Sequence, residues 1–226
     1  MCGIAGVIPV DKSLTGGMLV KMLEGLKHRG PDSTGVGIYT LNGRLDIIKD
    51  VGNISTLDEN FNISNMAGTH GIGHVRLATE SKVEKNYSHP FQSLNSPDIS
   101  IVHNGQITNY HNLRRKLERK GYIFKTENDS ELIAQLTAYY LQKGNDLETV
   151  LKISLDELDG TFSFIVATPD KLGIAKDRLA AKPMMLGENE KGLAIASEEI
   201  SIRSVLGDEV SVAELPPCEV RTWRIS

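Results

Sequence analysis

Apolar residues near the start of the chain predict one strand followed by one helix. A small apolar run over 2–8 ends at Pro9, which predicts a strand. Four apolar residues then recur at helical spacing: Leu14, Met18, Met22 and Leu26. Ser13 stands before them as the expected N-cap. The pattern therefore predicts a helix with one apolar face.

The segment that follows this helix is predicted to be mostly strand. Four apolar runs carry this prediction: 34–40, 45–51, 71–76 and 99–102. Asn42-Gly43 separates the first two runs and is typical of a hairpin turn. The polar stretch 78–88 has no clear period and is predicted to be a loop.

The second half of the chain is predicted to be helical first and then strand-like. Helices are expected at 109–120, at 130–142 with Asp129 or Ser130 as the cap, and at 146–158. Five strands are expected after them: 161–168, 172–176, 193–197, 209–212 and 219–224. Helices between two groups of strands favour layered α+β packing, and we expect residues 1–226 to form a single domain.

Composition limits the function classes. The 226 residues are 40% hydrophobic and 24% charged, which is ordinary for a soluble globular protein. The net charge of −4 argues against a nucleic-acid binder. The two cysteines, Cys2 and Cys218, cannot form a disulfide framework or a CxxC zinc motif. No targeting segment and no apolar stretch of roughly 20 residues is present, so we expect a cytoplasmic protein without a membrane partner.

Cys2 is the first candidate for chemistry because it directly follows the initiator methionine. We expect Met1 to be removed, which would leave Cys2 with a free α-amine of pKa about 7.7–8.0. A thiol beside such an amine combines a nucleophile and a base in one residue. The alternative is a small buried residue, since free cysteines are often buried.

Five short motifs follow in order along the chain: 1–7 (MCGIAGV), 28–32 (HRGPD), 73–79 (GHVRLAT), 103–105 (HNG) and 128–131 (NDSE). Together they resemble the class II glutamine amidotransferase domain, an N-terminal-nucleophile hydrolase. The resemblance covers nearly the whole sequence. It implies an α+β fold, a four-layer α-β-β-α sandwich of two mainly antiparallel sheets covered by helices.

The resemblance implies a catalytic role for three residues. Cys2 would attack the side-chain amide of glutamine and form a thioester, while its α-amine transfers protons. The Asn104 side-chain amide and the Gly105 backbone N–H would form the oxyanion hole. Taken alone, Asn104-Gly105 also suits a type I′ turn, so this alternative stays open.

The resemblance also implies a site for the zwitterionic end of glutamine. Arg76 would bind the α-carboxylate and Asp129 the α-ammonium group, while Thr79 would add a hydrogen bond to the carboxylate. The alternatives are a surface arginine at a strand end and a plain helix cap. Arg29 and Gly30 would support the surroundings of Cys2, or serve structure only.

The same resemblance makes the segment 77–89 a lid over bound glutamine. The histidines show no metal-binding spacing, so the sequence predicts no metal and no cofactor. Cys218 stands where family members often have glycine, and we interpret it as a residue at a turn.

The expected partners are glutamine and a synthase subunit that accepts ammonia on another chain, because no acceptor-domain motif follows the glutaminase motifs. Glutamate synthase is the favoured acceptor, and a relative of amidophosphoribosyltransferase is the alternative. A catalytically idle module that senses glutamine, and a glutaminase that acts alone, also remain. The sequence leaves open whether the chain forms a homo-oligomer.

Overall fold

The computed structural model describes residues 1–78 and 82–225. Two sheets form its centre. One contains β1 (Gly3–Pro9), β2 (Ser33–Tyr39), β3 (Leu45–Val51), β4 (His70–Arg76), β9 (Met185–Asn189), β10 (Gly192–Ala196) and β11 (Val212–Glu214). The other contains β5 (Phe91–Gln92), β6 (Ser100–Ile107), β7 (Gly160–Thr168), β8 (Lys171–Lys176) and β12 (Val220–Arg224).

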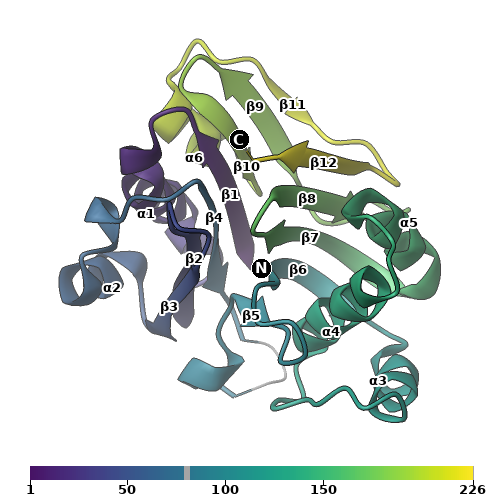
Figure 1. Ribbon diagram of the computed structural model, residues 1–226. Coiled ribbons are helices and arrows are strands. Elements are labelled where there is room, and N and C mark those ends of the chain that lie inside the picture. The colour runs from purple at the N-terminus through teal and green to yellow at the C-terminus, as the bar shows by residue number, and fades with distance from the viewer. Residues whose placement is uncertain (79–81, 226) are drawn as a thin grey trace.

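The first sheet has the strand order β11-β9-β10-β1-β4-β2-β3 and the second β12-β8-β7-β6-β5. Neighbouring strands pair antiparallel throughout the described residues. β1 lies inside its sheet, between β10 and β4 (Figure 1). The residue before β1 is therefore presented from the middle of the molecule.

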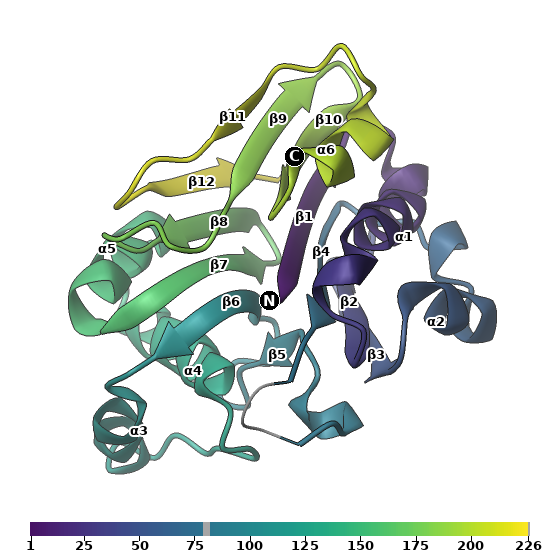
Figure 2. The same ribbon diagram turned by 180° about the vertical axis from the view of Figure 1, so that it is seen from behind.

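Helices cover the outer face of each sheet, as Figures 1 and 2 show from opposite sides. The first sheet is covered by α1 (Thr15–Leu26), α2 (Ile54–Phe61) and α6 (Glu199–Leu206). On the second sheet, α4 (Asp129–Gln142) and α5 (Leu147–Glu157) pack directly, and α3 (Tyr110–Glu118) packs beside α4.

A third apolar cluster fills the space between the two sheets. It joins Ile4 and Ile72 of the first sheet to Val102 and Ile165 of the second, all fully buried. Burying apolar side chains on both faces of each sheet is the main favourable contribution to such a fold. The layers run helix, sheet, sheet, helix, which confirms the predicted α+β four-layer sandwich.

Several local predictions differ from the structure. Asp11, not Ser13, caps the first helical turn, a 3₁₀ turn at Lys12–Leu14 that leads into α1. Asn128, not Asp129 or Ser130, caps α4 by accepting from the Ser130 N–H. The strand predicted at 209–212 is β11, shifted toward the C-terminus. Four of the labelled helices and strands were not predicted: α2, β5, β9 and α6.

Candidate active site

Cys2 stands immediately before β1 and beside the end of β4. The antiparallel pairing of β1 with β4 brings Cys2 next to Arg76, and the Cys2 thiol donates to Leu77 O at 3.8 Å. Burial raises the pKa of the Cys2 thiol, although Leu77 O, the terminal ammonium group, Arg76 and Arg29 oppose this shift. The half-buried thiol is therefore held in its protonated form beside two cations.

Arg29 holds the backbone of Cys2 in place. Its Nε donates to Cys2 O at 2.9 Å, and its Nη1 donates to Glu198 Oε1 at 2.6 Å. A β-carbon on the next residue, Gly30, would lie 2.5 Å from both the N and the C of Arg76. Arg29 thus contacts the backbone of Cys2, and Gly30 packs against the backbone of Arg76. Their role in supporting Cys2 stays a prediction.

Arg76 closes β4 and is buried, with 3% of its surface exposed, so the alternative of a surface arginine is wrong. Its Nη1 donates to Lys82 O at 3.0 Å. Asp32 stabilises the same strand end, because its N–H donates to Arg76 O and its carboxylate accepts from the Ala78 N–H at 2.7 Å. Thr79 lies outside the described residues.

Asn104 and Gly105 lie within β6, opposite Ser163 and Phe162 of β7, so the alternative of a type I′ turn is wrong. Gly105 has a φ of +151°, and a β-carbon there would lie 2.1 Å from Thr161 O. Asn104 is 3% exposed, and its Nδ2 has no hydrogen-bond partner among the described residues. Leaving a buried donor unpaired costs about 1–3 kcal/mol, which a ligand that accepts from it would recover.

Asp129 is the first residue of α4, and its carboxylate reaches across to β6. Asp129 Oδ2 accepts from the Ile107 N–H at 2.8 Å. Asn128 caps the helix, so the carboxylate of Asp129 is not used as a plain cap. The side chain of Asp129 keeps 23% of its surface exposed and carries its charge at the rim of a cleft.

That cleft has a volume of about 990 Å³ and brings Gly105 and Asp129 together. Its lining also includes Lys82, Arg114, Thr161 and Lys182. Cys2, Arg76 and Asn104 do not line it. Arg76 donates to the backbone carbonyl of Lys82, which lines the cleft, so Arg76 contacts one residue of the lining.

A row of buried histidines joins the two sheets next to these residues. His74 Nε2 donates to His103 O at 3.0 Å, which ties β4 to β6 one residue before Asn104. The rings of His74 and His89 stack at 3.8 Å, and His103 Nδ1 lies 2.9 Å from Ser130 Oγ. The N-terminus lies beside β6 in both views of the molecule (Figures 1 and 2). These contacts bring the nucleophile candidate and the oxyanion-hole candidates to one region between the sheets.

Sequence reasoning missed three residues that hold this region. Asp32 belongs to the second motif, but nothing in the sequence shows that it binds the N–H of Ala78. Glu198 lies 169 positions after Arg29, its partner. Glu131 belongs to the last motif and binds the segment before α4. No group of three His, Cys, Asp or Glu residues among the described residues could hold a metal ion.

Comparisons with known proteins define the class. The glutamine amidotransferase domain family matches residues 74–204. A protein of Methanothermobacter thermautotrophicus named "Putative glutamine amidotransferase" is 36% identical over all of both chains. The amidophosphoribosyltransferase of Methanocaldococcus jannaschii is 33% identical over 97% of this chain and 46% of its own length. The structure of glutamine phosphoribosylpyrophosphate amidotransferase from B. subtilis, complexed with ADP and GMP, superposes with a TM-score of 0.81.

That B. subtilis enzyme is 27% identical, and the match covers all of this chain and 49% of that one. The chain thus spans about half the length of two of these relatives and the whole of the third. The chain belongs to the glutamine amidotransferase domain family, and within it to class II, with the N-terminal-nucleophile fold. The predicted family and enzyme class are confirmed. Of the helices within 1–78 and 82–225, none is long and apolar enough to cross a membrane.

Proposed function

We propose that this domain hydrolyses the side-chain amide of glutamine to glutamate and ammonia. The observation that carries the proposal is the buried Asn104 Nδ2, which has no partner in the described part of the chain. It lies beside Gly105, whose backbone conformation and close neighbours leave no room for a side chain. Two neutral donors at one point suit the oxyanion that forms when an amide is attacked. Membership of the glutamine amidotransferase family supports the same chemistry.

The nucleophile in this proposal is Cys2, freed by removal of Met1. The Cys2 α-amine takes the thiol proton as the sulfur bonds to the side-chain carbonyl carbon of glutamine. The oxyanion is stabilised by Asn104 Nδ2 and the Gly105 N–H, and the amine then protonates the leaving nitrogen. Ammonia departs, and water cleaves the γ-glutamyl thioester to give glutamate and the free thiol. With Met1 attached, the Cys2 nitrogen is an amide and cannot act as a base.

The proposed substrate contacts distinguish glutamine from a simple amide. Arg76 binds the α-carboxylate and Asp129 the α-ammonium group, with Thr79 as a further donor to the carboxylate. The partly exposed carboxylate of Asp129 beside Gly105 in the cleft supports its part in this assignment. Arg29 and Gly30 support the position of Cys2 through the contacts described above.

We further propose that residues 1–226 act as a single cytoplasmic domain that passes ammonia to a synthase on another chain, with glutamate synthase as the favoured acceptor. The 33% identical amidophosphoribosyltransferase of M. jannaschii favours the alternative that the acceptor is a phosphoribosyl donor. Both acceptors leave the glutaminase step unchanged. Supplying each candidate synthase subunit in turn to the same domain separates them.

The test measures glutamate released from glutamine by protein whose intact mass shows loss of Met1. We expect turnover, stoichiometric labelling of Cys2 by a diazo-ketone analogue of glutamine, and loss of both in Cys2→Ala. Cys218→Ala is the matched control, because Cys218 is exposed and distant in sequence from the site, and it should retain full activity. No glutamate from processed protein, with or without a synthase subunit, would refute the proposal. Full activity of protein that retains Met1 would refute the amine mechanism alone.

A further inference from the structure

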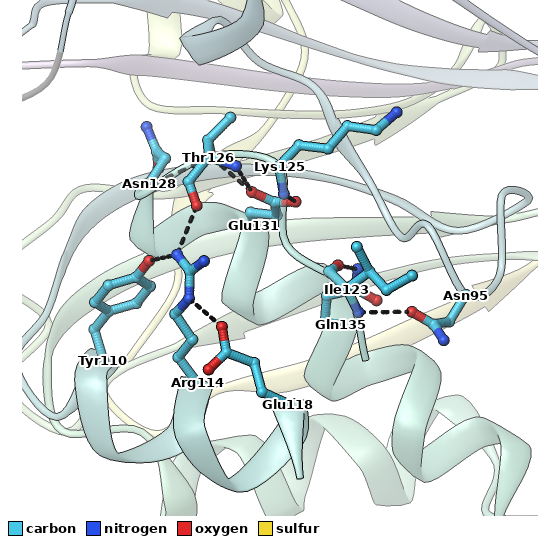
Figure 3. A network of polar contacts seen from close by, with 10 residues as sticks. All are labelled: Asn95, Tyr110, Arg114, Glu118, Ile123, Lys125, Thr126, Asn128, Glu131 and Gln135. Carbon is cyan, nitrogen blue, oxygen red and sulfur yellow. Dashed lines mark hydrogen bonds and ion pairs between the residues drawn. The ribbon is translucent and has the colours of Figure 1, made fainter. Parts of the chain in front are cut away.

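The segment 122–128, which leads into α4 and ends one residue before Asp129, has no regular secondary structure. It is nevertheless held by hydrogen bonds from neighbouring side chains (Figure 3). Buried backbone groups without a helix or sheet partner need such bonds. The conformation of this segment therefore depends on a few particular side chains.

Glu131 supplies three of these bonds. Its carboxylate accepts from the Lys125 N–H at 2.7 Å, the Thr126 N–H at 2.7 Å and Thr126 Oγ1 at 2.6 Å. Glu131 is 3% exposed. A buried carboxylate is costly unless donors surround it, and here three donors from the segment do so. The carboxylate thus fixes the segment against the first turn of α4.

Arg114 of α3 holds the opposite side of the segment. Its Nη1 donates to Thr126 O at 2.7 Å and to Tyr110 Oη at 2.5 Å, while its Nε donates to Glu118 at 2.8 Å (Figure 3). The guanidinium also lies over the Phe124 ring, 4.7 Å from its centre. Thr126 is thus bound from α4 through Glu131 and from α3 through Arg114.

Two hydrogen bonds connect Thr126 to the residues on either side of Asp129. Thr126 Oγ1 accepts from the Asn128 N–H at 3.2 Å, and Asn128 Oδ1 accepts from the Ser130 N–H at 2.9 Å. Asp129 lies between these two residues and presents its carboxylate beside the cleft. A shift of the backbone at Thr126 would therefore be passed to Asn128, the residue before Asp129.

We propose that Glu131 and Arg114 are positioning residues that aim Asp129 at the α-ammonium group of glutamine. This inference rests on the proposed function. Neither residue reaches the bond that is cleaved: Cys2, Asn104 and Gly105 stand on β1 and β6, whereas this network joins α3 to α4. We therefore expect the network to affect the binding of glutamine as a zwitterion and not the cleavage of its side-chain amide.

The sharpest test changes Thr126 and compares two ligands. Thr126→Val removes the hydroxyl with little change in shape, and Thr126→Ser keeps it. Glutaramate is the matched ligand because it has the amide and carboxylate of glutamine but lacks the α-ammonium group. We expect Thr126→Val to raise the glutamine KM about tenfold with kcat within twofold of the parent. The inhibition constant of glutaramate should change less than twofold, and Thr126→Ser should resemble the parent.

Glu131→Gln should act in the same direction, because the amide NH₂ would face a backbone N–H where a carboxylate oxygen now accepts. Arg114→Lys should also raise KM, because lysine cannot donate in the two fixed directions of the guanidinium fork. The rise should be smaller, because lysine keeps the positive charge. Arg115→Ala is the matched control on α3, because Arg115 contacts Asn112 and takes no part in the network. It should leave KM unchanged.

The outcomes separate the two proposals. If Thr126→Val and Glu131→Gln weaken glutamine and glutaramate equally, or leave the glutamine KM unchanged while the parent is active, the positioning role is refuted and the glutaminase stands. If the parent releases no glutamate, calorimetry of glutamine on Cys2→Ala protein replaces the rate measurement. A parent that neither hydrolyses nor binds glutamine refutes both proposals.

Discussion

Several residues around the Cys2 thiol stand where two backbone segments come very close together. Gly105 sits at a φ that side chains rarely adopt, and Gly30 lies against the backbone of Arg76 with no room for a methyl group. Asn104 Nδ2 is buried and has no hydrogen-bond partner within 1–78 and 82–225. The sequence shows that a glycine or an asparagine stands at each of these positions. The contact that requires that residue type is made with a residue far along the chain.

Replacing Gly30 with alanine should destabilise the protein severely. The new β-carbon would lie 2.5 Å from two backbone atoms of Arg76, and neither can move without disturbing β4. We expect a loss of about 3 kcal/mol in the free energy of unfolding, at the upper end for overpacking. Urea unfolding followed by circular dichroism measures it.

Gly25→Ala is the control for this substitution. Gly25 lies within α1, and among the described residues outside that helix the atom nearest to its added β-carbon would be Ser201 Cα, at 3.4 Å. Alanine there should stabilise by about 0.5–1 kcal/mol, since it favours helix. Equal stability of the Gly30→Ala and Gly25→Ala proteins would show that Gly30 does not pack as described.

Elements far apart in sequence meet at the nucleophile. Arg29 comes from the turn after α1, and Glu198 is the residue directly before α6. The two form an ion pair at 2.6 Å, and Arg29 also donates to Cys2 O. Hydrogen bonds from Arg29 and His28 outweigh burial and hold the pKa of Glu198 below its usual range. An element that the sequence did not predict thus stabilises the residue that the sequence singled out first.

Glu198→Gln should cost about 1–2 kcal/mol of unfolding free energy, because Arg29 keeps a buried charge with a weaker acceptor. Glutamine turnover should fall as well, since Arg29 then holds Cys2 O less firmly. Glu199→Gln is the matched control on the same helix. Glu199 pairs with Arg203 in an exposed contact, so its loss should cost no more than about 0.5 kcal/mol. Identical urea midpoints for the two variants would contradict the assignment.

At the scale of the whole molecule, buried neutral histidines connect the two sheets. His70 Nε2 donates to Thr168 O at 2.9 Å, and His74 Nε2 donates to His103 O, so both histidines of β4 bind the second sheet. Burial lowers the pKa of His70 to about 4 and that of His74 to about 3. Burial also lowers the pKa of His103 and places that of His89 well below 6.5.

These histidines predict a loss of stability in mild acid. The unfolded chain binds protons below pH about 6.5, whereas the folded chain leaves His70 and His74 neutral, so stability rises with pH over this range and is lost as pH falls. Each of these two residues should cost about 2 kcal/mol between pH 7 and pH 5. Urea unfolding at pH 7, 6 and 5 measures this dependence.

A His70→Gln variant should lose one histidine's share of the pH dependence, because glutamine can donate to Thr168 O but does not titrate in this range. A free energy of unfolding that stays constant from pH 7 to pH 5 in the parent protein would contradict the explanation.

By itself, the sequence determined the family, the layered α+β class and the residues with chemical capacity. Apolar spacing marks α1 and α5, each of which buries one face, whereas α4 is buried on all sides from Ser130 to Tyr139. The five motifs carry the reactive side chains. Short elements such as α2, β9 and α6 have too few turns or residues for a clear period, and their existence depends on packing.

Only the tertiary structure decided what these residues do to one another. Asn104-Gly105 suits a turn by local preference, yet pairing with β7 makes it part of a strand. Asp129 looks like a helix cap, yet Asn128 caps α4 and leaves the carboxylate beside the cleft. The physical reason is that pairing and burial between distant segments outweigh local propensities of a fraction of a kcal/mol to about 1 kcal/mol.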